Sequence, residues 1–164
     1  MHRACVPVFV RGLTNLAAIL EKAQAHAETR KIDSSVLVGG RLFPDMLPLS
    51  NQVQIASDAA KGAAARLVGR DPPSFPDEEK TFPELIERCR KTIAYLETLA
   101  PKDFEGSEER TVTWKTRSGD RSLPGIDYLL RQSTPNFYFH VTTAYDILRH
   151  NGVEVGKRDY LGPQ

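Results

Sequence analysis

The residue best suited to proton transfer is His140, which ends the aromatic run Phe137-Tyr138-Phe139. An unperturbed histidine has a pKa of about 6.5, so it can accept and return protons near neutral pH and act as a general base. Histidines enclosed by aromatic side chains are also common as hydrogen-bonded core residues. The catalytic and the structural interpretation of His140 therefore both stay open.

A second candidate feature is a group of aromatic residues close to His140 in the sequence. Tyr128, Tyr138 and Tyr145 belong to one C-terminal segment, and Trp114 precedes that segment. Together they could line an apolar pocket with few polar groups, which is the usual character of a small-ligand site. Aromatic residues at helical spacing are also typical of a helix that packs in a core.

Other reactive residue types show no recognisable arrangement. No GxSxG, GxGxxG, P-loop, HExxH or EF-hand spacing occurs. Cys89 falls on an apolar helical stripe and is expected to be buried and inert, whereas Cys5 is expected near an exposed terminus. Asp45 and Asp58 form no evident carboxylate pair; we expect Asp45 to cap a helix and Asp58 to face solvent.

Composition restricts the class of protein. The chain has 164 residues, which predicts one domain over residues 1–164. Lys and Arg number 22 against 21 Asp and Glu, so there is no basic excess for nucleic acid. Apolar runs are far shorter than the roughly 20 residues of a spanning helix, and the start of the chain lacks a signal-peptide pattern. We therefore expect a cytoplasmic protein with no membrane or nucleic-acid partner.

Apolar residues recur at alternating spacings of three and four in segments that must position these side chains. The expected helices cover roughly residues 7–28, 44–69, 81–99 and 124–150. Thr81 and Glu84 have the spacing of a capping box, and Asp33 is placed to cap a short turn. Pro135 either kinks the last helix or, with Thr134 as the cap, begins a shorter one. Alanines dominate one side of the second helix, which allows a partner helix to approach closely.

The period changes to two between residues 105 and 123, where Val112 and Trp114 alternate with Thr111 and Thr113. This alternation predicts a small β-hairpin with its turn at Ser118-Gly119-Asp120. The overall expectation is an all-α fold, a four-helix bundle with a small β-hairpin inserted before the last helix.

Several sequence runs resemble a known family. They are Arg41-Leu42-Phe43-Pro44-Asp45-Met46, Gln52-Val53-Gln54, Pro135-Asn136-Phe137-Tyr138-Phe139-His140 and Ala144-Tyr145-Asp146-Ile147-Leu148-Arg149. The chain resembles the DinB/YfiT-like four-helix-bundle superfamily over nearly its whole length, within a bacterial and fungal branch described only as a domain of unknown function. The resemblance implies a DinB-like bundle with helices in up-down-down-up or up-down order.

The resemblance also implies a candidate site. Many members of the superfamily hold a divalent metal with three histidines, and some use that metal to activate a small thiol for S-transfer. Here His140 stands at one ligand position, Asn136 at the second, and Gln52, with Gln54 as the alternative, at the third. Amide oxygens are weak ligands for zinc or nickel, so this set is expected to bind such metals poorly. The same side chains could form a buried polar network instead.

Three hypotheses result, and whether the protein is an enzyme stays open. The first is a cofactor-free pocket for a small organic ligand between the second and fourth helices. The contacts of this pocket are Gln52, Asn136, His140, Tyr145 and Trp114. If the pocket is catalytic, the expected reaction is metal-free acid–base or isomerase-type chemistry. The second is a thiol S-transferase dependent on zinc or nickel, with His140 as one metal ligand. The third is a non-catalytic homodimer that interacts through the alanine-rich side of the second helix.

Overall fold

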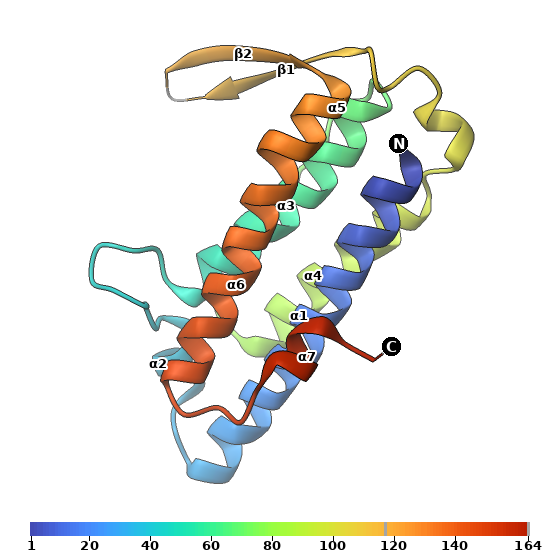
Figure 1. The fold of residues 1–164 in the computed structure, drawn as a ribbon. Coiled ribbons are helices and arrows are strands. Elements are labelled where there is room, and N and C mark those ends of the chain that lie inside the picture. Colours follow the sequence, from blue (N-terminus) through green and yellow to red (C-terminus); the bar gives the residue numbers. More distant parts are fainter. Residues whose placement is uncertain (117, 164) are drawn as a thin grey trace.

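The computed structural model describes residues 1–116 and 118–163, which are mostly helical and include a two-stranded sheet (Figure 1). Four long helices lie side by side: α1 (His2–Arg30), α3 (Leu49–Leu67), α4 (Phe82–Glu97) and α6 (Thr134–His150). α1 and α6 run in one direction, and α3 and α4 run in the other (Figure 1). α1 packs mainly on α4, and α3 packs mainly on α6.

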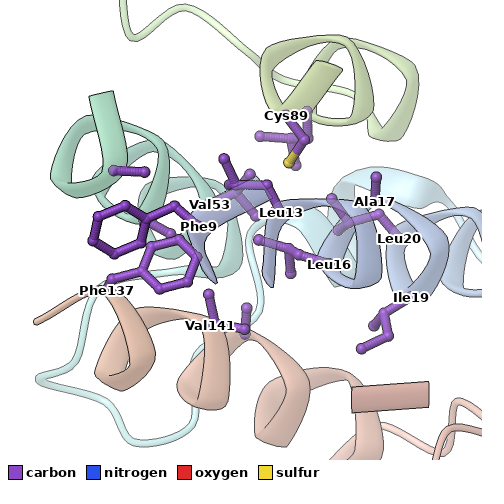
Figure 2. Close-up of a cluster of buried hydrophobic side chains, with 14 of the residues drawn as sticks. Phe9, Leu13, Leu16, Ala17, Ile19, Leu20, Val53, Cys89, Phe137 and Val141 are labelled. Carbon is purple, nitrogen blue, oxygen red and sulfur yellow. The ribbon is translucent and has the colours of Figure 1, made fainter. Parts of the chain in front are cut away.

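The core lies between these four helices. The apolar stripe of α1 includes Phe9, Leu13 and Leu16, all fully buried. The Phe9 ring meets the Phe137 ring of α6 edge-on, with centroids 4.9 Å apart (Figure 2). Burial of each such side chain contributes about 1.5–3 kcal/mol, so this stripe does much to hold α6 beside α1.

Both cysteines belong to this core. Cys89 is fully buried, as its position on the apolar stripe predicts. The expectation for Cys5 was wrong, because α1 begins at His2 and brings Cys5 into the packed interior. Burial raises the pKa of each thiol to about 12, which leaves both protonated and unreactive at neutral pH.

α1 is also the one helix, among the described residues, that is long and apolar enough to span a membrane by length and composition alone. Half of its most apolar 18-residue window is buried against the rest of the protein. Core helices of soluble proteins satisfy the same two criteria, so this observation is weak evidence for a membrane span.

α3 begins later than its sequence pattern predicts. Met46 continues the apolar spacing, but the helix starts at Leu49, after Pro48 in an extended conformation. A proline disfavours the helical conformation of the residue before it, so Leu47 cannot extend the helix, and Asp45 is not its cap. The alanines at 56, 60, 63 and 64 are fully buried within the chain. That side of α3 is therefore unavailable for a contact between subunits.

Two of the predicted caps are confirmed. Asp33 accepts a hydrogen bond from the backbone N–H of Ser35 at the start of α2 (Ser34–Val38). Thr81 and Glu84 form a reciprocal capping box at the start of α4. Each cap satisfies a backbone donor that the first helical turn leaves unpaired.

The hairpin pairs β1 (Thr111–Thr116) antiparallel with β2 (Gly119–Pro124). Gly119 and Asp120 belong to β2, so the predicted turn at residues 118–120 lies too late, and residue 117 is outside the described residues. The short helix η1 (Pro101–Phe104) precedes the hairpin. Trp114 packs on Tyr128 with ring centroids 4.9 Å apart, which anchors the hairpin to the helices.

The last long helix does not start afresh at Pro135. α5 (Gly125–Asp127), the π-helical segment η2 (Tyr128–Ser133) and α6 follow one another without a break. Proline has no N–H to donate to the preceding turn, and a π-helical turn is one way for a helix to accommodate that missing bond. Thr134 is not a cap, and its buried hydroxyl has no partner among the described residues. The C-terminal segment that follows α6 includes the short helix α7 (Lys157–Leu161).

Candidate functional site

The structure brings Gln52 of α3 and His140 of α6 together. His140 Nδ1 lies 2.7 Å from Gln52 Oε1, and Gln52 Nε2 donates to the carbonyl oxygen of Leu47. A carbonyl oxygen only accepts, so the Leu47 bond fixes the amide with its oxygen toward the imidazole. The proton of a neutral His140 must then sit on Nδ1, which leaves a lone pair on Nε2.

His140 is a buried residue, only 9% exposed. Burial lowers the pKa of His140, because the charged imidazolium loses hydration that the neutral ring hardly needs. Gln52 carries no charge that would oppose this effect. The imidazole is therefore neutral at pH 7 and can accept a proton or a hydrogen bond at Nε2.

A hollow of about 190 Å³ lies between α3 and the η2–α6 helix, close to the hairpin. Three residues that the sequence analysis proposed, Trp114, Tyr128 and Asn136, line it. The other lining residues are Ile55, Asp58, Ala59, Arg66, Gln132 and Ser133. The hollow thus combines an aromatic pair with amide, hydroxyl and charged groups, the mixture that orients a small ligand.

The five predicted contact residues do not all share this hollow. His140 and Gln52 lie outside its lining, although Asn136 is one helical turn before His140 on the same side of α6. Tyr145 is elsewhere: its ring packs on Tyr160 of α7, with centroids 5.8 Å apart. Five residues correspond to about 140° of rotation around a helix, so Tyr145 cannot share a face with His140.

The three positions matched to metal ligands do not fit a zinc or nickel centre. Gln52 Oε1 is already engaged by His140 Nδ1, and Asn136 faces the hollow. Only one of these three positions carries an imidazole, and the amide oxygens at the other two are weak ligands for zinc and nickel. Across residues 1–116 and 118–163, no group of three or more His, Cys, Asp or Glu side chains could hold a metal ion.

Arg66 contributes the one guanidinium of the hollow. Its Nη1 donates to the Tyr128 hydroxyl oxygen at 3.0 Å. No carboxylate of a described residue lies within 4.0 Å of the Arg66 guanidinium. The hollow therefore contains a cation with no ion-pair partner among the described residues, which the sequence analysis did not single out.

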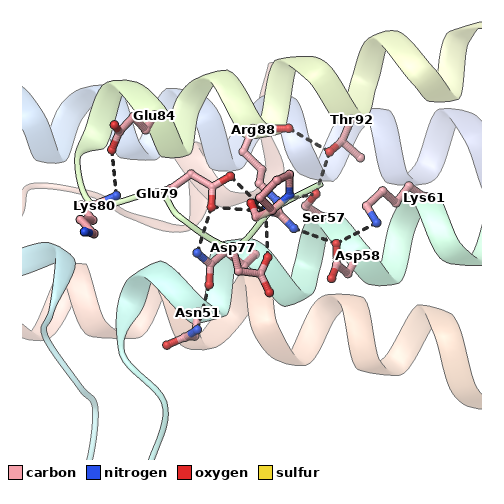
Figure 3. A network of polar contacts seen from close by, with 12 residues as sticks. Asn51, Ser57, Asp58, Lys61, Asp77, Glu79, Lys80, Glu84, Arg88 and Thr92 are labelled. Carbon is pink, nitrogen blue, oxygen red and sulfur yellow. Dashed lines mark hydrogen bonds and ion pairs between the residues drawn. The ribbon is translucent and has the colours of Figure 1, made fainter. Parts of the chain in front are cut away.

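The structure also contains a buried charge network that sequence analysis missed. Arg88 of α4 has a side chain only 1% exposed, and it pairs with Asp58, Asp77 and Glu79 at 2.8–3.0 Å (Figure 3). Its Nε also donates to Ser57, which is hydrogen-bonded to Thr92. The network ties the proline-rich connection between α3 and α4 to both helices.

Within this network Glu79 is held in its charged form. Burial alone would raise the pKa of Glu79, but hydrogen bonds from Gln54 and Arg88 outweigh burial and lower it below the ordinary value. Gln54, the alternative metal-ligand position, therefore serves the network and not the His140 site.

Asp58 connects the network to the hollow. Its side chain is 44% exposed and lines the hollow, while Oδ1 accepts a hydrogen bond from Arg88 at 2.8 Å and forms an ion pair with Lys61 at 3.0 Å. The expectation that Asp58 simply faces solvent was thus incomplete. A signal was present in the sequence: Arg88 lies between Leu85 and Thr92 on the core side of α4, and a buried guanidinium requires carboxylate partners.

Comparison with known proteins places these features in context. Residues 1–161 match the family described as "Domain of unknown function (DUF1993)". The chain is also similar to a DinB family member protein from Shewanella denitrificans, known from a crystal structure, with 43% sequence identity and a TM-score of 0.94. That likeness covers 99% of this chain and 92% of the other. A search of the curated proteins found no match.

Proposed function

Because this chain belongs to the DUF1993 family and shares the mostly helical fold of a DinB family member, we propose that it binds a small organic ligand between α3 and α6. The observation that carries this proposal is the hollow in which Trp114, Tyr128 and Asn136 meet. Its position between the second and last long helices supports a DinB-type four-helix bundle in which these helices frame the site.

Metal-free acid–base chemistry is the reaction class that fits this proposal. A neutral His140 with its Nδ1 proton held by Gln52 presents Nε2 as a proton acceptor, and it lies one helical turn from Asn136 of the hollow. Burial lowers the pKa of His140 and its partner Gln52 carries no opposing charge, so the imidazole is neutral, as a base near pH 7 requires. Because the donor set does not suit zinc or nickel, the proposed reaction does not use either metal.

Ligand-observed NMR with a library of small organic compounds tests whether the hollow binds. Ala59 lines the hollow, so Ala59→Phe should fill it, whereas Ala18→Phe adds the same side chain to the exposed side of α1. We expect some compounds to bind the wild type and the Ala18 variant but not the Ala59 variant. If every compound that binds the wild type binds the Ala59 variant equally well, the hollow is not the binding site.

A homodimer that serves as an interaction module is the second candidate. Large apolar side chains stay exposed on α6, on η2 and on the loop before α3: Phe139 is 57%, Leu130 is 54% and Phe43 is 63% exposed. Exposed apolar groups of this kind favour burial against another chain. Light scattering at micromolar concentration should then report a dimer for the wild type and a monomer for Phe139→Asp; a monomeric wild type would exclude this candidate.

A further inference from the structure

We infer that the hollow between α3 and α6 takes a small aromatic carboxylate, which Arg66 holds by its charge and which Trp114 and Tyr128 contact by its ring. This inference rests on the proposed function and adds the chemical class of the ligand. Four observations carry it: the cation with no carboxylate partner among the described residues, the glycine next to its guanidinium, the aspartate that pairs with other cations, and the size and aromatic wall of the hollow.

The cation is placed for an incoming anion. Arg66 lines the hollow, and the hydrogen-bond partner of its guanidinium among the described residues is the Tyr128 hydroxyl at 3.0 Å. Guanidinium groups carry five N–H donors in a fixed planar arrangement that matches a carboxylate. One protein hydrogen bond leaves most of these donors free. The Tyr128 hydroxyl accepts from Arg66, so its own proton can be donated to the same anion.

Gly62 explains why Arg66 lies there. A glycine inside α3 costs about 0.5–1 kcal/mol relative to alanine, so its presence calls for a reason. A Cβ atom at position 62 would lie 2.6 Å from Arg66 Nη1. The guanidinium therefore lies back across the helix in the space that Gly62 leaves. An alanine at this position must displace the far end of Arg66.

Asp58 does not cancel the charge of Arg66. It is more than 4.0 Å from the Arg66 guanidinium and pairs instead with Arg88 and Lys61. Its cationic partners are Lys61 at 3.0 Å and Arg88 at 2.8 Å, which Asp77 and Glu79 share, so Arg66 has no carboxylate partner among the described residues. A single negative charge on the ligand matches a single free cation.

The size and walls of the hollow define the rest of the ligand. Its volume of about 190 Å³ is below the roughly 300–1,000 Å³ of sites for drug-sized molecules, so a compound of one ring fits. Trp114 and Tyr128 form a tilted aromatic pair with centroids 4.9 Å apart. Aromatic walls favour a flat, apolar ring, and Arg66 beside Tyr128 orients its carboxylate.

The chain has a single tryptophan, so Trp114 fluorescence reports directly on the hollow. The probes are phenylacetate and its neutral counterpart phenylacetamide, which have nearly the same shape. We expect phenylacetate to change the emission saturably and to bind at least about tenfold more tightly than the amide, because the lost interactions are charge-assisted hydrogen bonds.

Three variants identify the group responsible. Arg66→Gln should reduce the affinity for phenylacetate to that for the amide and leave the amide's affinity unchanged. Gly62→Ala should also weaken phenylacetate binding selectively while leaving the thermal midpoint of unfolding unchanged or higher, since alanine favours the helix. Arg70→Gln, which removes an exposed arginine just beyond α3, is the matched control and should keep the wild-type preference.

The possible failures are distinct. Equal affinity for the acid and the amide, a preference that survives Arg66→Gln, or no response to phenylacetate would each overturn the carboxylate inference. None of these results would change the conclusion that a compound whose binding is lost in Ala59→Phe binds in the hollow. Conversely, if no compound loses binding in Ala59→Phe and phenylacetate does not change the Trp114 emission, the proposed function fails as well.

Discussion

His140 makes the stability of the protein depend on pH. Burial lowers its pKa in the folded state, whereas in the unfolded chain it titrates at about 6.5. Below that pH the unfolded state binds more protons, so this contribution to stability is complete above about pH 6.5 and is lost as the pH falls through the folded pKa.

The His140→Gln variant isolates this contribution, because glutamine can still donate to Gln52 but does not titrate. We expect the wild type to lose more free energy of unfolding than the variant between about pH 7.5 and about pH 5, as measured by urea denaturation at each pH. His150→Gln, at an exposed position ending α6, should behave like the wild type. Parallel losses in the wild type and the His140 variant would contradict the assignment.

The partner of His140 should set its protonation. Gln52→Glu places a carboxylate where a neutral oxygen now lies 2.7 Å from Nδ1, and an adjacent negative charge favours the imidazolium. The pKa of His140 should therefore rise above its wild-type value, which NMR titration of the imidazole protons can follow. An unchanged titration would show that the two side chains are not in contact in solution.

At the scale of elements, the junction between the hairpin and α5 depends on Gly125. This residue is buried, and a Cβ atom there would collide with the backbone carbonyl oxygen of Ser107. Backbone cannot move aside as a flexible side chain can, so Gly125→Ala should destabilise the protein by about 1–3 kcal/mol or more.

Urea denaturation measures this cost. Gly156→Ala is the comparison, because a Cβ atom at position 156 would meet nothing within 4 Å. It should change the free energy of unfolding by less than about 1 kcal/mol. If the two substitutions have equal effects, the approach of Ser107 to Gly125 is not a constraint on this junction.

At the scale of the whole molecule, Arg88 connects α4, α3 and the proline-rich connection. Arg88→Leu removes the cation that three carboxylates and Ser57 share. Loss of one partner from a buried ion pair typically costs about 3–5 kcal/mol, and the partial exposure of Asp58 and Asp77 places the expected value near 3 kcal/mol.

Arg90→Leu is the matched control on the same helix. Arg90 pairs with Glu21 where both side chains are more than half exposed, so its loss should change stability by less than about 1 kcal/mol. Chemical denaturation compares the two variants, and limited proteolysis should show faster cleavage between residues 70 and 80 only for Arg88→Leu. A control as unstable as Arg88→Leu would mean that burial of the pair is not what matters.

The local chemistry of the chain was sufficient to predict the helices, the hairpin and two caps. Periodic apolar residues and capping side chains act over a few positions, so Thr81 with Glu84 and Asp33 could be placed from spacing alone. Cys89 was predicted to be buried for the same reason. Where local rules compete, the weaker pattern fails, as at Met46, where Pro48 overrides the apolar spacing.

Only the tertiary structure determined which side chains meet. Gln52 and His140 are 88 positions apart, and their contact depends on the rotation of α3 against α6, which no local pattern specifies. The same packing separates Tyr145 from the hollow and places Arg66 there beside Tyr128. It also surrounds Arg88 with carboxylates from two segments. A sequence lists the groups available for chemistry, but their distances and burial, which set charge and pKa, exist only once the helices pack.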